Sequence, residues 1–427
     1  MQTASKKVIN AWAMYDWANS AYSLIITSAI FPAYYTAIAP AQVQLFGRTF
    51  ERAALASYSI SFSFLLIACI SPILSSIADY KGNKKAFMQF FTYVGSAACC
   101  SMFFFTKDNI GFGILTSVVA SIGYCGSIVF YNAYLPEIAA EQDQDRISAK
   151  GFVMGYIGSV LLMVVCLTCI MLNDIMKLGW GAYPARFSFL AVGLWWAGFA
   201  QISFKQLPNS KATDQHTEFS IFTNGFHELK KVWQELKHQP NLSKFLRSFF
   251  FYNMGVQTVM YLATYFASDE LKMESSQLII TVLIIQIVAI VGATLFSKLS
   301  NKTNNIFTLC SLILIWIGIC FFASRVTTVT QFYIIAFCVG MVMGGIQSMS
   351  RSTYSKLLPE TKDNASFFSF YDVCDKMGTV MGTLLFGYVS EFLGGMRNSV
   401  VALMIFFIIG FVLLLFVKMK PNITLTS

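Results

Sequence analysis

Charged residues are scarce in this sequence. Only 12% of the 427 residues are Asp, Glu, Lys or Arg, about half the share of about 25% that soluble globular domains carry. Hydrophobic residues make up 56%, with 41 Phe and 19 Met, and the mean hydropathy is +0.61. This balance argues against a water-soluble fold and predicts a protein whose outer surface faces lipid.

The sequence also lacks the signatures of several other classes. The net charge of +9 is spread over short polar stretches and forms no basic stripe, so we expect no nucleic-acid partner. Long apolar runs replace the alternating segments typical of outer-membrane barrels. There is no Walker loop, and His227-Glu228 is not followed by a second His, so no ATP site, metal site or cofactor is expected. The ten Cys all fall in apolar runs, where we expect them to pack as small hydrophobic side chains.

Apolar runs predict twelve membrane-spanning helices, because about 20 apolar residues cross a hydrocarbon core of ~30 Å. Six lie in the first half, at 11–39, 53–77, 86–106, 110–135, 147–172 and 184–204. Six lie in the second half, at 242–267, 277–296, 306–323, 331–353, 365–392 and 399–417. We therefore expect an all-α integral membrane protein with an N-terminal six-helix bundle (1–204), a cytoplasmic linker (205–241) and a C-terminal six-helix bundle (242–427).

Lys and Arg are unevenly distributed between alternate connections. With the N-terminus inside, 21 of the 30 lie in inner segments, eight in outer segments, and Lys376 within a span. Because basic residues are retained on the cytoplasmic side, both termini are expected in the cytoplasm. The first apolar run is too long for a cleavable signal peptide, and we expect it to remain in the protein.

The linker is the one sizeable polar stretch. Its apolar residues recur at spacings of four and three, which predicts one helical face. These residues are Phe222, Phe226, Leu229, Trp233 and Leu236. Lysines on the other faces predict an amphipathic helix on the inner membrane surface. All three histidines fall in the linker, so only carboxylates could carry a coupled proton within the spans.

Two parts of the chain repeat each other. Residues 131–137 (YNAYLPE) and 354–360 (YSKLLPE) share four of seven positions at an offset of 223. Gly151 and Gly155 correspond to Gly378 and Gly382 at an offset of 227. Each pair forms a GxxxG pattern, which lets helices approach closely within lipid. Two parallel repeats of six spans are typical of alternating-access transporters, whose substrate site lies between the halves near the midplane.

Ionisable residues within spans are costly and point to function. Asp16 lies in the first span, where Tyr15, Asn19 and Tyr22 share a helical face that we expect to point into a cavity. Anchoring of the aromatic side chains at the membrane surface is the alternative, since Asp16 lies in the cytoplasmic third.

The eleventh predicted span carries Asp372, Asp375 and Lys376. Asp372 and Lys376 are four residues apart and can pair. A carboxylate here could carry a proton, with Lys376 as its partner or as a contact for a substrate carboxylate. A self-neutralising pair with a gate contact is the alternative. Uncharged donors and acceptors at the predicted substrate site are Asn253, Gln257 and Gln347.

The connection between the second and third spans, residues 76–85 (SIADYKGNKK), resembles the D-R-x-G-R-K loop of the major facilitator superfamily. Tyr80 and Asn83 replace its usual arginines. The resemblance implies that Asp79 acts in an inner-face charge lock between spans two and eleven, whereas an ordinary positively charged inner loop is the alternative. The predicted inner-gate residues are Asp79, Lys84, Lys85, Arg146 and Arg351.

Further strings resemble the autophagy-related vacuolar effluxer family and its bacterial relatives over nearly the whole chain. They are YDWANS (15–20), FYNA (130–133), GYIG (155–158), GVQT (255–258) and residues 345–351. These strings add Tyr131, Asn132 and Tyr156 to the predicted substrate or coupling site. Met254 stands where many relatives carry Asp, so the coupling scheme would differ if that acid binds a cation or a proton. Fungal members export amino acids from the vacuole, which implies an amino-acid-like substrate.

We therefore expect a monomeric secondary transporter in the bacterial cytoplasmic membrane. It would export a small polar or zwitterionic solute, such as an amino acid or a short peptide, by alternating access coupled to a proton or sodium. An integral membrane enzyme acting on lipid-linked substrates is one alternative, although its interfacial cluster of His, Asp and Arg is missing. A sensor or scaffold, which would tolerate loss of the intramembrane charges, is the other.

Overall fold

The computed structural model describes residues 2–45, 47–177, 179–209, 221–392 and 395–419, which are mostly helical. Elements of the first half are α1 (Lys6–Ala21), the π-helix η1 (Tyr22–Ala29), α2 (Ile30–Ile38), β1 (Gln42–Leu45), β2 (Arg48–Glu51), α3 (Arg52–Lys81), α4 (Lys84–Ser101), η2 (Met102–Phe104), α5 (Ile110–Ala133), α6 (Leu135–Ile138), η3 (Glu141–Asp143), α7 (Gln144–Met176) and α8 (Tyr183–Gln206). The linker contributes α9 (Ile221–His238). The second half contains α10 (Pro240–Leu271), α11 (Ser275–Lys302), α12 (Asn305–Ala323), α13 (Val329–Leu357), α14 (Asn364–Phe392) and α15 (Met396–Leu414).

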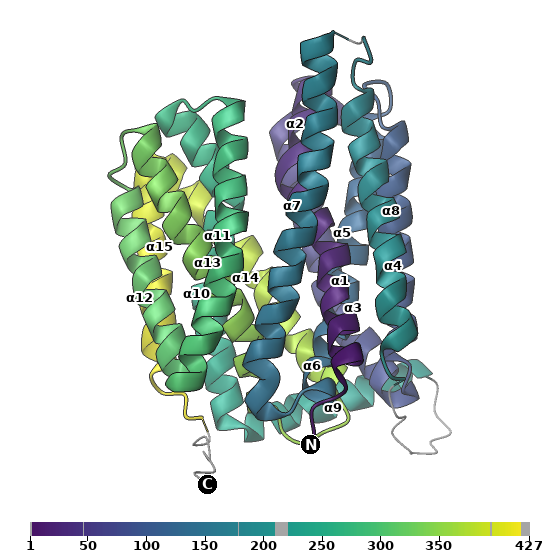
Figure 1. Ribbon diagram of the computed structural model, residues 1–427, viewed down its shortest axis with the longest axis vertical. Coiled ribbons are helices and arrows are strands. Elements are labelled where there is room, and N and C mark those ends of the chain that lie inside the picture. Colours follow the sequence, from purple (N-terminus) through teal and green to yellow (C-terminus); the bar gives the residue numbers. More distant parts are fainter. Residues whose placement is uncertain (1, 46, 178, 210–220, 393–394, 420–427) are drawn as a thin grey trace.

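Every predicted span overlaps one of these long helical segments. Ten segments of the described chain are long and apolar enough to cross a membrane. Helices α10 and α14 are not among the ten, but they are 32 and 29 residues long and run beside the others (Figure 1). Both carry polar residues in the middle of their sequences, which lowers their hydropathy. The predicted all-α membrane fold is confirmed.

The helices form two groups that stand side by side (Figure 1). In the first group, α1 packs on α7 and α8, and α4 packs on α5 and α8. In the second, α10 packs on α14 and α15, and α11 packs on α13. The two groups meet where α7 contacts α11 and α13, and where α3 and α5 contact α14.

Large apolar side chains are exposed around the outside of both groups. Examples are Phe104, Leu115, Leu194, Phe322 and Leu384, each more than 60% exposed. A surface of this kind is stable against lipid and not against water.

The paired glycines sit at close contacts between two helices. A Cβ on Gly155 of α7 would lie 3.2 Å from the backbone oxygen of Asp16 in α1. A Cβ on Gly382 of α14 would lie 2.9 Å from the backbone oxygen of Met254 in α10. The repeat found in the sequence therefore corresponds to two equivalent close packings, α1 on α7 and α10 on α14.

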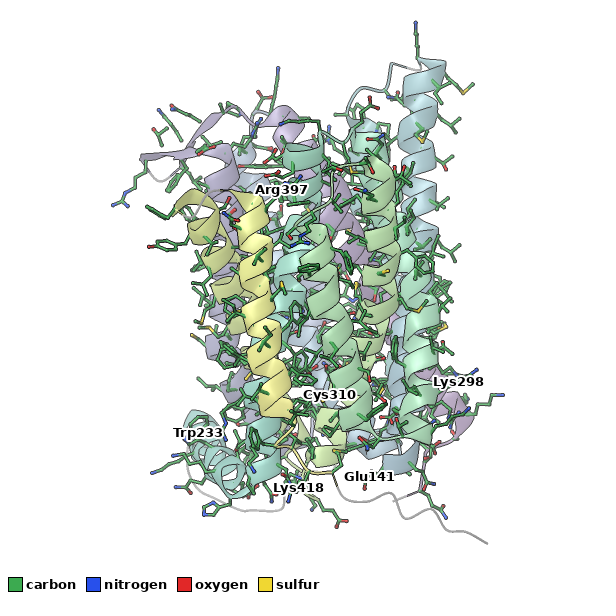
Figure 2. All side chains as sticks on the ribbon, turned by 90° about the vertical axis from the view of Figure 1, so that its left-hand side faces the viewer. Glu141, Trp233, Lys298, Cys310, Arg397 and Lys418 are labelled. Atoms are coloured by element: carbon green, nitrogen blue, oxygen red, sulfur yellow. The ribbon has the colours of Figure 1, made fainter. Side chains whose placement is uncertain are left out.

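The start of α1, the linker helix α9 and the end of α15 lie at one end of the molecule, which we call the linker end (Figure 1). Figure 2 shows Trp233, Glu141 and Lys418 at this end, and Arg397 at the other. The opposite end carries an antiparallel β-hairpin of β1 and β2 that the sequence analysis did not predict. We call it the hairpin end.

Helix α9 packs mainly on α3, and also on α10 and α14. Val232 and Leu236 are buried, and the Trp233 ring lies 5.7 Å from that of Phe370. Lys231 forms an ion pair with Asp363, just before α14. The predicted helix is present and packs on the bundle. Its position on the inner membrane surface stays a prediction. The side chains of Phe222, Phe226 and Leu229, and all of His216, lie outside the described residues.

Candidate functional site

Arg351 of α13 contacts three helices of the other group. Its Nη1 donates to Asp16 Oδ2 of α1 at 3.2 Å and to Asn132 Oδ1 of α5 at 3.3 Å. Its Nε donates to the Ser148 hydroxyl of α7 at 3.0 Å, and its Nη2 donates to the Ser148 carbonyl at 2.8 Å. Tyr131 of α5 donates its hydroxyl to Asp16 Oδ2 at 2.7 Å. We call these five residues the Arg351 cluster.

The surroundings of the Arg351 cluster suit a buried charge pair. Arg351 and Asp16 are only 3% and 5% exposed. The guanidinium lies 4.2 Å from the Phe152 ring centre and 4.8 Å from that of Trp12, which adds cation–π attraction. Gly151 makes room for the pair, because a Cβ there would lie 2.5 Å from Asp16 Oδ2. Burial is tolerated because both charges are hydrogen-bonded as well as paired.

A second group of polar side chains lies between α10 and α14. Lys376 Nζ is 2.5 Å from Asp375 Oδ2 and 3.5 Å from Asp372 Oδ1. Asn253 and Gln257 of α10 donate their side-chain N–H groups to Asp375 Oδ1 at 2.7 and 2.8 Å. We call these five residues the central cluster. It contains two carboxylates and one ammonium, so one negative charge is left over when all three are ionised.

Asp79 joins the two groups at the linker end. It lies near the end of α3 and accepts hydrogen bonds from the backbone N–H groups of Ala365 and Ser366, at 3.3 and 2.7 Å, and from the Ser366 hydroxyl at 2.8 Å. A carboxylate in this position satisfies free N–H groups in the first turn of α14 and interacts favourably with its dipole. Lys84 lies 3.6 Å from Asp79 and also pairs with Glu137 after α5.

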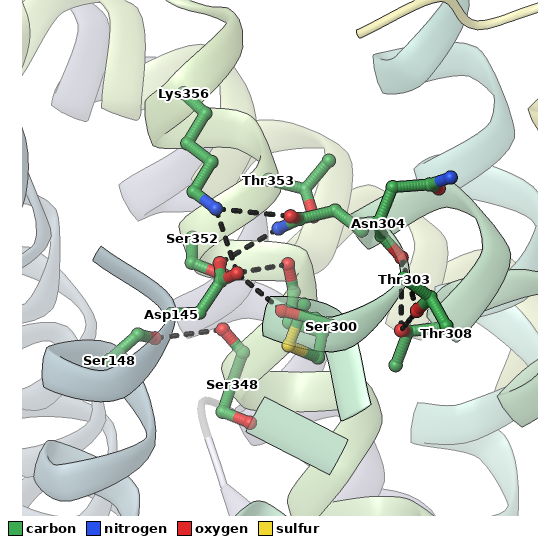
Figure 3. A network of polar contacts seen from close by, with 12 residues as sticks. Asp145, Ser148, Ser300, Thr303, Asn304, Thr308, Ser348, Ser352, Thr353 and Lys356 are labelled. Atoms are coloured by element: carbon green, nitrogen blue, oxygen red, sulfur yellow. Dashed lines mark hydrogen bonds and ion pairs between the residues drawn. The ribbon is translucent and has the colours of Figure 1, made fainter. Parts of the chain in front are cut away.

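A further contact joins the two groups through Asp145 of α7 (Figure 3). Its Oδ2 lies 2.7 Å from Lys356 Nζ of α13 and accepts the Ser300 hydroxyl of α11. Its Oδ1 accepts from Asn305 Nδ2 at 2.8 Å. Asp145 is 1% exposed, and each of its oxygens has at least one donor.

The aromatic face of α1 is packed inside the first helical group. The Tyr15 hydroxyl is hydrogen-bonded to that of Thr92 in α4 at 2.6 Å. The Tyr22 ring lies 4.9 Å from that of Tyr124 in α5. Asn19 is fully buried. The predicted cavity-facing arrangement of Tyr15, Asn19 and Tyr22 therefore differs from the structure, in which helix packing takes up this face.

Two predicted gate residues lie away from the contact between the groups. Lys85 donates to the backbone oxygen of Leu207, just after α8, at 2.9 Å and, among the described residues, forms no hydrogen bond or ion pair with the second helical group. Arg146 is 65% exposed at its side chain and pairs with Asp143, three residues earlier. The neighbouring Asp145 makes the contact that was expected of Arg146, because α7 turns residue 145 towards α13 and residue 146 towards solvent.

Tyr156 and Gln347, both predicted for the substrate site, do meet. The Tyr156 hydroxyl of α7 donates to Gln347 Oε1 of α13 at 2.7 Å. Asp145, Lys356 and Asn305 were not among the residues predicted for the site. One signal was available, since the offset of 227 that relates the paired glycines also relates Asp145 to Asp372.

Solved membrane transporters share this architecture. The human organic anion transporter MFSD10 (TETRAN) has a TM-score of 0.69 at 10% identity, with 96% of this chain and 98% of that chain covered. FucP in its outward conformation has a TM-score of 0.70 at 14% identity, with 97% and 98% covered. The fold is thus that of a major facilitator superfamily transporter, a multi-pass membrane protein.

Within that class, residues 4–424 match the family described as "Vacuole effluxer Atg22 like", and the chain belongs to this family. The "Uncharacterized MFS-type transporter YxiO" of Bacillus subtilis (strain 168) is 34% identical over 419 residues, 97% of this chain and 95% of that protein. "Autophagy-related protein 22" of Yarrowia lipolytica (strain CLIB 122 / E 150) is 22% identical over 463 residues, 88% and 78% of the two chains. The family expected from the sequence is confirmed.

Proposed function

We propose that this protein is a secondary transporter that exports a small polar or zwitterionic solute, with amino acids and short peptides as the substrate class. It works by alternating access, coupled to a proton or sodium. Residues 1–204 and 242–427 act as the two moving units, joined by the linker 205–241, and the protein functions as a monomer. The proposed location is the bacterial cytoplasmic membrane, with the linker end and both termini in the cytoplasm.

The central cluster is the observation that carries this proposal. Asp375 is held by Lys376, Asn253 and Gln257, so charged and amide groups converge at a buried position between α10 and α14. Groups of this kind are costly within a membrane and mark substrate or ion pathways. Both signs of charge together with amides suit the ammonium and carboxylate groups of a zwitterion.

The contacts at the linker end support the proposal that the protein works by alternating access. Arg351 with Asp16, Lys356 with Asp145, and Asp79 with the start of α14 all join one helical group to the other. Release of a solute towards this end requires all three to open. They are therefore proposed to act together as the inner gate.

A ligand screen followed by flux measurements tests the proposal. Purified protein is heated with individual amino acids and short peptides, because a ligand that binds the native state raises its unfolding temperature. Stabilising compounds are then tested for exchange across proteoliposome membranes. We expect Asp375→Asn to abolish exchange, whereas the control Glu270→Gln, which removes a carboxylate paired with Arg397 at the hairpin end, leaves it intact. Exchange that is unchanged in Asp375→Asn would refute a transport role for the central cluster.

A further inference from the structure

Asp372 differs from Asp79, Asp145 and Asp375, three other aspartates in the contacts between helices. In Asp79, Asp145 and Asp375, both carboxylate oxygens accept hydrogen bonds. In Asp372, Oδ1 lies 3.5 Å from Lys376 Nζ, and Oδ2 is buried with no hydrogen-bond partner among the described residues. Among the described residues, it is the one buried carboxylate oxygen without a hydrogen-bond partner.

The internal repeat provides a direct comparison. Asp145 and Asp372 occupy equivalent positions at the offset of 227. Asp145 has a lysine at 2.7 Å and two further donors, from Asn305 and Ser300. Asp372 is 4% exposed and shares its lysine with Asp375, which holds Lys376 one ångström closer. The same position thus carries a saturated carboxylate in one half and an under-coordinated one in the other.

Within the described part of the chain, Lys376 is the one cation within ion-pair distance of Asp372. Helix α14 itself supplies Cys374, Asp375 and Lys376, while α5 supplies Cys125 near Asp372 and Tyr124 near Lys376. Helix α10 places Tyr261 near Lys376 and Asp375 and directs the two amides of the central cluster to Asp375, and α3 contributes the Phe64 ring, 5.5 Å from Lys376 Nζ. Arg397 of α15 pairs with Glu270, and Lys231 of α9 pairs with Asp363.

Burial of an ionised carboxylate with an unsatisfied oxygen is costly. Adding a proton to Oδ2 removes the excess negative charge of the central cluster and converts the unsatisfied acceptor into a hydroxyl. A proton needs one oxygen, whereas hard metal cations take several oxygen ligands. The amides of Asn253 and Gln257 direct their N–H groups to Asp375.

From this geometry we propose that Oδ2 of Asp372 is the proton-binding atom of the transport cycle, while Asp375 stays ionised and holds Lys376 in place. The step is a simple protonation: the carboxylate takes a proton from one side of the membrane and releases it to the other. The inference rests on the proposed transport function and assigns its coupling ion and the residue that carries it.

Difference infrared spectroscopy of the protein in liposomes tests this without a known solute. Acidification should produce the carbonyl band of a protonated carboxyl group. We expect this band to be lost in Asp372→Asn, to require a lower pH in Asp375→Asn, because Lys376 then neutralises Asp372 alone, and to be shifted in frequency in Asp372→Glu, which is the informative variant if Asp372→Asn does not fold. A band that persists unchanged in Asp372→Asn, or no band at any pH at which the protein is folded, would overturn the inference.

Flux measurements separate this inference from the function on which it rests. With an imposed pH gradient, wild-type exchange should be accelerated and Asp372→Asn should exchange solute without responding to the gradient. Exchange that follows a sodium gradient and ignores pH would overturn the assignment of Asp372 but leave the transport function standing.

Discussion

Arg351 of α13 and Asp16 of α1 form a buried ion pair, with Nη1 and Oδ2 3.2 Å apart, although the residues are 335 positions apart in the sequence. The pair lies between the two helical groups, and Tyr131, Asn132 and Ser148 supply its remaining hydrogen bonds. A buried pair that is held by several hydrogen bonds from both helical groups can be broken only if its partners separate together. The Arg351 cluster is therefore suited to two discrete states, closed and open.

Removing one member of this pair should destabilise the folded protein more than removing both. Loss of one partner of a buried ion pair typically costs about 3–5 kcal/mol, because the other charge stays buried without compensation. We expect Arg351→Gln to lower the thermal unfolding temperature of the purified protein clearly. The double variant Asp16→Asn/Arg351→Gln should recover part of that loss. Additive effects of the two substitutions would show that the pair is not coupled.

Gly151 should not tolerate a methyl group. A Cβ at this position would lie 2.5 Å from Asp16 Oδ2 and 2.8 Å from Arg351 Nη2, so Gly151→Ala must displace the pair. Overpacking of this kind costs about 1–3 kcal/mol. Gly198→Ala in α8 is the matched control, since nothing lies within 4 Å of its Cβ and alanine is favoured over glycine in helices by about 1 kcal/mol. Equal unfolding temperatures for the two variants would contradict the close packing of α1 on α7.

Asp145 and Arg146 are neighbours in the sequence, but only substitution of Asp145 should weaken the contact between the two helical groups. Asp145→Asn weakens the contact with Lys356 across the two groups and leaves the lysine, 5% exposed at its side chain, without its counter-charge. We expect a faster rate of thiol labelling for a cysteine placed at Ser348, which is fully buried beside Ser148 at the linker end. Arg146→Gln removes an exposed pair worth about 0–1 kcal/mol. Its labelling rate should match that of the unsubstituted protein.

The fold could be predicted from the sequence because lipid imposes simple rules. Apolar runs of about 20 residues and the repeat around Gly151 and Gly378 depend on local sequence alone, and both correspond to the structure. The contact between Asp79 and the start of α14 was expected from the resemblance of its loop to a known signature. Which of Asp145 and Arg146 contacts the second helical group could not be predicted in the same way, because it depends on the rotation of α7 relative to α13.

Other features could not be predicted from the sequence, each for a different physical reason. Tyr15 and Tyr22 share a polar aromatic face, and periodicity alone does not distinguish a cavity wall from a contact with a neighbouring helix. The hairpin of β1 and β2 is only four residues per strand and has a single glycine, Gly47, at its turn. The unsatisfied oxygen of Asp372 is a property of three-dimensional packing and leaves no trace in residue spacing.

Alternating access itself is tested most directly by distances between the two helical groups at both ends of the molecule. Spin labels at Glu141 and Lys302 report on the linker end, and labels at Lys107 and Thr327 report on the hairpin end; all four side chains are exposed. Pulsed electron spin resonance is measured in liposomes, after replacement of the ten native cysteines, with and without Arg351→Gln. We predict that this substitution lengthens the distance at the linker end and shortens the distance at the hairpin end. Distances that stay unchanged, or that lengthen at both ends together, would contradict the account.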